Sequence, residues 1–174
     1  MPGLPPYGAP AIAFPADWAR SGREGVVVEF EQADGGKWTG NFKPGFGGLD
    51  DVRRHPNGRD VLVASSGNLW QVDPMHRSAE TLESAVLAVW DVADRLVYDD
   101  QGLWFVCLGS TGLIWRTGRI SWDGFDAVQV TKNRILGMAW SPIENAWLPF
   151  EVDLETGVVV GGSYLDEHRR LSLL

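Results

Sequence analysis

Short stretches in which apolar and polar residues alternate run through most of the chain. In GVVVEFEQA (25–33), Val26, Val28 and Phe30 alternate with Glu29 and Glu31, which is typical of a strand with one buried face. The DGG turn at 34–36 and the returning stretch KWTGNF (37–42) complete a predicted hairpin. The same rhythm predicts further strands at 50–55, 60–65, 69–74, 96–100, 103–109, 113–117, 127–130, 135–140, 147–154 and 158–164. The chain is therefore predicted to be mainly β.

Several of these strands are apolar on both faces. In LWFVCLG (103–109) and ILGMAW (135–140), both sets of alternate positions are apolar. A sheet with one face in water shows clean alternation, so these sheets are expected to be covered on both sides. Antiparallel meanders stacked as a small propeller-like or sandwich or barrel arrangement would provide that cover. A parallel α/β fold is excluded because its crossovers need helices of about a dozen residues.

One segment, SAETLESAVLAVWDVADRL (78–96), fits two structures. Its apolar residues at 79, 82, 86, 89 and 93 have helical spacing. Val86, Val89, Trp90 and Val92, however, are residue types that favour strands. A strand over 85–92 is predicted, with a helix as the alternative.

The N-terminal residues differ from the rest in composition. Five of the first fifteen residues are proline, which fixes φ and lacks a backbone donor. Residues 1–24 are therefore predicted to form an extended arm that packs on the body or on a second subunit, ending in a short helix over 16–22 that starts at Pro15. Residues 25–174 are predicted to form a single β-repeat domain, since 174 residues suffice for one core.

Tryptophans recur at long intervals. Trp38, Trp70, Trp115 and Trp147 are 32, 45 and 32 residues apart. With the units at 55–73, 99–117 and 133–157, each built of turns, strands and a tryptophan, the stretch 25–164 resembles β-propeller repeat proteins. The resemblance implies blade-like sheets, three or four at this length. ISWDGF (120–125) and DLETGVVVGGSY (153–164) also look like segments of a group of uncharacterised bacterial proteins.

Composition and charge limit the function classes. The formal net charge is −8 and the pI is about 4.8, which argues against direct binding to a nucleic-acid duplex and favours a basic protein partner. The single cysteine, Cys107, lies in an apolar run and is predicted to be a buried, inert thiol, as fits a reducing cytoplasm. The N-terminus lacks the basic region of a signal peptide, and no run approaches the length of a membrane span. A cytoplasmic location is therefore predicted.

Candidate groups for catalysis or metal binding carry little signal. The three histidines, His55, His76 and His168, have no partners at metal-ligand spacing, and His55, before a PNG turn, is expected to face solvent. The pairs Asp50-Asp51 and Asp99-Asp100 would point to opposite sides of a strand, so neither forms a site by itself. No metal, cofactor or catalytic set is predicted, and enzymatic activity is not favoured.

The best candidate for a binding site is the SWDG loop (121–124). Trp122 lies there beside Asp123 and close to Arg116 and Arg119. An exposed tryptophan among opposite charges can stack on a sugar or anchor a protein partner, and loops between repeat units often carry function. The alternative is that Trp122 caps the core.

Three functions remain open from the sequence. The first is a non-enzymatic binding module, such as an inhibitor or immunity-like protein for a basic partner. The second is a carbohydrate or small-molecule binder with hydrolase or lyase activity at Trp122, Arg116 and Asp123. The third is a structural subunit of a homo-oligomer, associated through the N-terminal arm or the apolar LSLL terminus (171–174).

Overall fold

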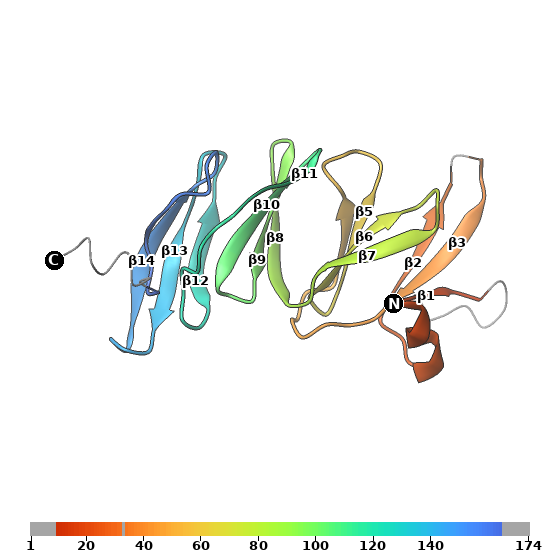
Figure 1. Ribbon diagram of the computed structural model, residues 1–174, viewed down its shortest axis with the longest axis horizontal. Helices are drawn as coiled ribbons and strands as arrows, with labels where there is room; N and C mark the ends of the chain where they lie inside the picture. Colours follow the sequence, from red (N-terminus) through yellow and green to blue (C-terminus); the bar gives the residue numbers. More distant parts are fainter. Residues whose placement is uncertain (1–9, 33, 165–174) are drawn as a thin grey trace. The chain divides into compact units, whose positions relative to one another are not determined.

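The computed structural model describes residues 10–32 and 34–164, which form fifteen strands and one 3-10 helix (Figure 1). The strands are arranged in four sheets of three or four strands. The predicted fold class, mainly β with antiparallel meanders, is confirmed. Contacts within the chain define two compact units, unit 1 (Met1–Val86) and unit 2 (Leu87–Leu174). The prediction that 25–174 act as one domain stays a prediction.

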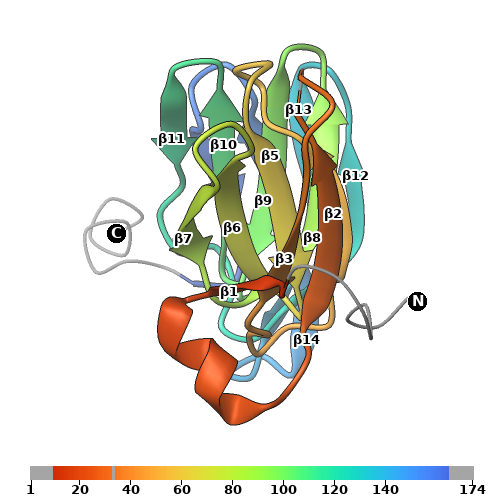
Figure 2. The same ribbon diagram turned by 90° about the vertical axis from the view of Figure 1, so that its right-hand side faces the viewer.

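The first sheet of unit 1 is built on the predicted hairpin. Strand β2 (Val26–Glu31) pairs with β3 (Lys37–Phe42), and β3 pairs in parallel with β1 (Ile12–Phe14) on its other edge. The short helix predicted after Pro15 is the 3-10 helix η1 (Ala16–Ser21), which ends at Gly22 with φ of 63°. Figure 2 shows β1 beside β3, with this helix at the lower end of the same sheet. The described part of the N-terminal arm therefore packs on the body.

The second sheet of unit 1 is a four-stranded meander. Its strands are β4 (Asp51–Arg54), β5 (Val61–Ser65), β6 (Asn68–Asp73) and β7 (Ser78–Glu83), hydrogen-bonded in chain order. The two sheets share one core, because Phe14 stacks on Phe42 with ring centroids 5.2 Å apart, and both rings contact Trp70. Burying such aromatic side chains is the main stabilising contribution in a unit of this size.

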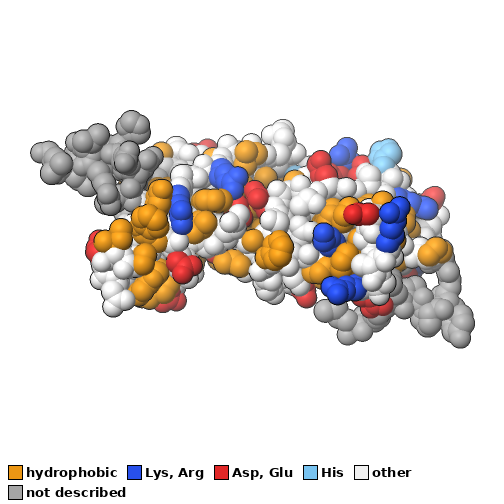
Figure 3. Space-filling model, turned by 60° about the horizontal axis from the view of Figure 1, so that its bottom comes forward, with side chains coloured by type: hydrophobic (Ala, Val, Ile, Leu, Met, Phe, Trp, Pro, Cys, Tyr) orange, Lys and Arg blue, Asp and Glu red, His pale blue; other side chains and the backbone are white. Residues whose placement is uncertain are grey.

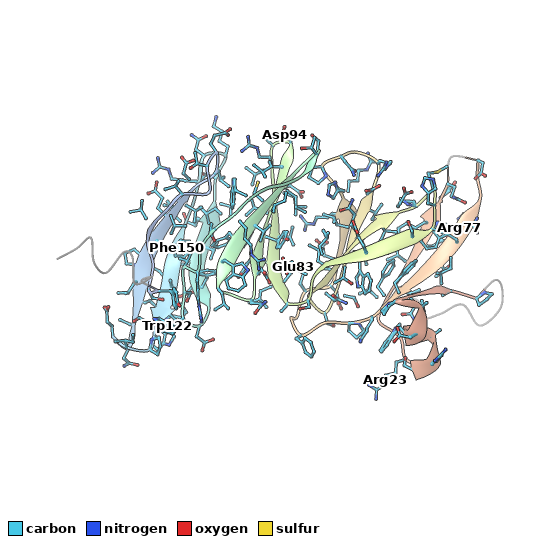
Figure 4. All side chains as sticks on the ribbon, viewed as in Figure 1. Arg23, Arg77, Glu83, Asp94, Trp122 and Phe150 are labelled. Atoms are coloured by element: carbon cyan, nitrogen blue, oxygen red, sulfur yellow. The ribbon has the colours of Figure 1, made fainter. Side chains whose placement is uncertain are left out.

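Unit 2 contains two more meanders. The first, which begins with the last residue of unit 1, consists of β8 (Val86–Val92), β9 (Arg95–Asp100), β10 (Trp104–Gly109) and β11 (Gly112–Arg116). The second, called sheet D below, consists of β12 (Phe125–Val130), β13 (Arg134–Ser141), β14 (Ala146–Asp153) and β15 (Val159–Gly161). Phe105, Phe125 and Phe150 pack together between the two sheets, and Figure 4 shows Phe150 in this interior.

The ambiguous segment 78–96 forms strands. Strand β8 spans Val86–Val92, as predicted for 85–92, and the helical alternative is wrong. Strand β7 (Ser78–Glu83) was not predicted, because SAETLE has no apolar alternation. It is an edge strand held by backbone pairing with β6, which does not depend on side-chain type.

Candidate functional site

Two of the four predicted site residues lie together in unit 2. The Arg119 guanidinium lies over the Trp122 ring, 5.3 Å from its centroid, and over the Tyr164 ring at 4.7 Å. The two rings meet edge to face with centroids 4.8 Å apart. Arg119 also donates from Nε to the Ser121 carbonyl and from a terminal nitrogen to the Trp122 carbonyl, both at 2.9 Å. The guanidinium is therefore held in one position by π contacts and by backbone acceptors.

The loop that carries Trp122 is tied to sheet D by serine hydroxyls. The Trp122 amide donates to Ser163 Oγ at 3.2 Å, and Ser163 Oγ donates to the Trp140 carbonyl at 2.5 Å. Ser121 Oγ donates to the Gly124 carbonyl at 2.6 Å and closes the turn. Trp122, labelled at the lower end of unit 2 in Figure 4, thus lies beside the end of β13 on a constrained loop. The sequence left open whether Trp122 is an exposed binding residue or a cap on the core. Its side chain is half-buried, which is intermediate between the two.

The other two predicted residues have different surroundings. Arg116, at the end of β11, forms an ion pair of 2.7 Å with Asp100 and lies over the Trp104 ring at 4.6 Å. Asp100 is fully buried and also accepts a 2.5 Å hydrogen bond from the Trp104 indole. Asp123 is exposed, and its backbone amide donates to Ser121 Oγ. Arg116 thus contributes to a buried-carboxylate network, while Arg119 accompanies Trp122.

Sheet D has one face in the core and one apolar face that is at least partly open. Ile135, Ala139, Phe150 and Val152 belong to the core cluster of unit 2. Since alternate residues of a strand point to opposite sides, the opposite face carries Leu136, Met138, Trp140, Trp147, Pro149 and Val160. We call these six residues the outer face. Hydrophobic side chains gather over sheet D at the left of Figure 3.

A tryptophan pair lies on the outer face near the turn that joins β13 to β14. Trp140 and Trp147 are directly opposite each other on β13 and β14, and their rings meet edge to face at 5.3 Å. Trp147 is 40% exposed and Val160 is 67% exposed. Of the four regularly spaced tryptophans, Trp38, Trp70 and Trp115 are buried in cores, so Trp147 is the exception. The expectation that this sheet is covered on both sides is therefore not met by the described part of the chain.

Acidic side chains surround the outer face. Asp126 pairs with Met138 in the register of β12 and β13, Glu144 lies in the turn that joins β13 to β14, and Asp123 follows Trp122. All three residues are exposed. Glu151, opposite Val160, is neutralised by a 3.0 Å ion pair with Arg134. An apolar centre with a polar rim is the usual composition of a protein interface.

The remaining titratable candidates have structural surroundings. His55 was expected to face solvent, but it is buried, and burial lowers its pKa. Its Nδ1 accepts the Asn57 amide and its backbone amide donates to the Asp60 carbonyl, so the PNG turn folds over it. Cys107 is buried as predicted, and burial raises the pKa of its thiol to about 11. His168 lies outside the described residues.

Within 10–32 and 34–164, no group of three or more His, Cys, Asp or Glu side chains is arranged to hold a metal ion. No helix in the same part of the chain has the length and apolar character to cross a membrane.

Tyr164 and the Trp140–Trp147 pair were not predicted to belong to a binding surface. Tyr164 follows the last strand and reaches Trp122 only through the tertiary fold. The signal for the pair was present in the sequence, because both sets of alternate positions in 135–140 are apolar. That pattern indicates two apolar faces but does not say which of them the rest of the chain covers.

Comparison with known proteins gives a limited result. No protein family model matches the sequence, and no curated protein matches it. Among solved structures, the chain is similar to the crystal structure of the N-terminal domain of Nup159, with a TM-score of 0.43 and 14% identity. The match covers 75% of this chain and 34% of that chain, so the protein spans about a third of that domain's length. A similarity at this level supports no conclusion about function.

Proposed function

We propose that this protein is a binding module that engages a protein partner through the outer face of sheet D. The observation that carries the proposal is the Trp140–Trp147 pair, with Trp140 half-buried and Trp147 exposed, at the turn end of an apolar strip. Soluble proteins seldom expose contiguous apolar patches of this kind unless a partner covers them. Tryptophan, tyrosine and arginine are also the residue types that dominate binding energy at interfaces.

The Arg119–Trp122–Tyr164 cluster extends this surface. The Trp122 amide lies 3.4 Å from the Trp140 carbonyl, so the loop and the outer face adjoin at the same end of sheet D. Because Arg119 is already fixed by two carbonyls and two rings, it would lose little side-chain freedom on binding. A pre-ordered aromatic and arginine surface of this kind favours tight association.

The partner is proposed to be basic around an apolar centre. Asp123, Asp126 and Glu144 place exposed carboxylates at the rim, and the whole chain has a net charge of −8. Complementary charge at a rim accelerates association and selects the partner, while the apolar centre supplies most of the affinity. The single buried cysteine fits a reducing compartment, and we place this interaction in the cytoplasm.

Replacing Trp147 with alanine is expected to weaken partner binding by about 30-fold, the loss of a hot-spot residue worth about 2 kcal/mol. Trp147 is partly exposed, so the variant should keep its fold. The partner is captured with tagged protein from lysate of the source organism at low and high salt, identified by mass spectrometry, purified and titrated calorimetrically.

Val52→Ala is the matched control, because Val52 is an exposed apolar residue of β4 in unit 1. It should bind the partner like the unsubstituted protein. Equal affinity for Trp147→Ala would contradict the proposed surface, and salt-independent binding would contradict the basic rim. If the protein captures only itself, and light scattering gives a dimer that Trp147→Ala dissociates, the outer face serves self-association and the heterologous partner is wrong.

A further inference from the structure

Unit 1 contains a cavity that the outer face does not involve. Its volume is about 570 Å³, within the range of pockets that hold small molecules. Phe14 of β1, the loop 43–46, Asn68 and Trp70 of β6, and Thr81 of β7 are among the residues that line it. All lining residues fall within 14–84, so the cavity belongs to unit 1 alone.

Asn68 is one of the lining residues, and its side chain carries an unsatisfied acceptor. The side chain is 92% buried, and its Nδ2 donates to the Lys43 carbonyl at 3.0 Å, which fixes the orientation of the amide. Its Oδ1 is buried and has no hydrogen-bond partner among the described residues. A buried amide oxygen without a partner loses the stabilisation it had in water.

The wall of the cavity opposite β7 is held in place by backbone contacts. The Gly45 amide donates to the Ser65 carbonyl at 2.8 Å, and the Phe46 amide donates to the Ser84 carbonyl at 3.2 Å. The loop packs so closely that a Cβ at Gly45 would overlap the Ser84 carbonyl oxygen and lie 2.6 Å from the backbone nitrogen of Asn68. The cavity is therefore formed before any ligand arrives, which lowers the entropic cost of binding.

The lining combines aromatic surface with polar groups of both kinds. Phe14 and Trp70 form the apolar interior, and the Phe46 ring stands at the rim with 93% of its surface exposed. Lys43 supplies donors, Glu80 supplies acceptors, and the hydroxyl of Thr81 can do either. With one cationic and one anionic side chain, the polar lining favours neither a strongly anionic nor a strongly cationic ligand.

We infer that this cavity binds a neutral, hydroxyl-rich ring, as found in saccharides. Each hydroxyl can donate to Glu80 or Thr81 and can also accept from Lys43, which matches a lining of mixed donors and acceptors. The C–H surface of such a ring can pack on the exposed Phe46 side chain, since aromatic rings offer a large apolar face. A carbohydrate site at Trp122, in unit 2, was one of the alternatives left open by the sequence, and the cavity proposed to hold a saccharide lies in unit 1.

The test is a titration of the full chain with maltose, cellobiose and di-N-acetylchitobiose at up to millimolar concentration. Binding is followed by calorimetry and by saturation-transfer NMR. At least one disaccharide is expected to bind, and Phe46→Ala should raise its Kd roughly fivefold to tenfold, the loss expected for one aromatic contact. Thr81→Ala should raise the Kd by a smaller factor. Both side chains are exposed, so both variants should fold.

Met75→Ala is the control, because Met75 is exposed in unit 1 and does not line the cavity. It should leave the Kd unchanged. The inference is overturned if none of the three disaccharides binds, or if Phe46→Ala and Thr81→Ala bind as tightly as Met75→Ala. Tighter binding of glucuronate or glucosamine than of the neutral sugars would also overturn it. Phe46→Ala should leave protein-partner binding at the outer face unchanged, so the two proposals fail separately.

Discussion

Replacing Gly25 with alanine is expected to destabilise unit 1 by at least about 3 kcal/mol. This is the upper end of the usual cost of inserting an extra methyl group into a packed site. A Cβ at this position would overlap the carbonyl oxygen of Phe42 and lie 2.9 Å from Ser65 Oγ. The backbone oxygen cannot move freely, because it accepts a 2.8 Å hydrogen bond from Ser65 Oγ. The measurement is urea unfolding followed by tryptophan fluorescence.

Gly48→Ala is the matched control for this experiment. A Cβ at Gly48 meets no atom within 4 Å, and its φ is not in the left-handed region. This substitution is expected to change the free energy of unfolding by less than about 1 kcal/mol, because the added methyl group meets no atom and acts only on the freedom of the unfolded chain. Equal urea midpoints for Gly25→Ala and Gly48→Ala would contradict the close approach of Gly25 to Phe42 and Ser65.

The stability of unit 2 is expected to fall as the pH rises from about 4 to about 7. Burial raises the pKa of Asp99 to about 7 from its ordinary value of 3.8, and the hydrogen bond from the Gly102 amide opposes this rise. A raised pKa means that the folded state binds the proton more tightly than the unfolded state. The stability that the proton on Asp99 contributes to the folded state is therefore fully present below pH 3.8. It is lost as the pH rises through about 7.

Asp99→Asn tests this expectation. The amide oxygen can still accept the Gly102 amide, but the side chain cannot ionise. Above pH 7 the variant should unfold at a higher urea concentration than the unsubstituted protein. Its free energy of unfolding should be higher by at most roughly 4 kcal/mol, because one pKa unit corresponds to about 1.4 kcal/mol. The difference should vanish near pH 4. Asp123→Asn, which removes an exposed carboxylate, controls for net charge. A difference that stays constant from pH 4 to pH 8 would contradict an ionisable buried Asp99.

Secondary structure was predictable where side chains carry the signal. Strands such as β2 and β10 follow directly from period-two alternation and from runs that are apolar on both faces. The edge strand β7 left no such signal, because its side chains are mostly polar and the strand is held by backbone hydrogen bonds to β6. The segment around β8 was ambiguous for the opposite reason, since its apolar positions fit both periods, and pairing with β9 decided it.

The candidate site was only partly predictable. Arg119 and Trp122 are three residues apart, so their contact needs only a local turn. Arg116 is equally close in sequence to Arg119, but it ends β11, and the order β11-β10-β9 brings it to Asp100, sixteen residues earlier. Such pairings depend on the register between strands, which no local pattern encodes.

By itself, the sequence determined the class of structure, because alternation, turn residues and apolar content act locally along the chain. It determined the acidic charge and the buried character of Cys107 for the same reason. Only the tertiary structure decided which face and which polar atom the described residues leave uncovered, namely the outer face with Trp147 and the amide oxygen of Asn68. Covering a face or satisfying an acceptor depends on residues distant in sequence, and these meet only after the sheets have packed.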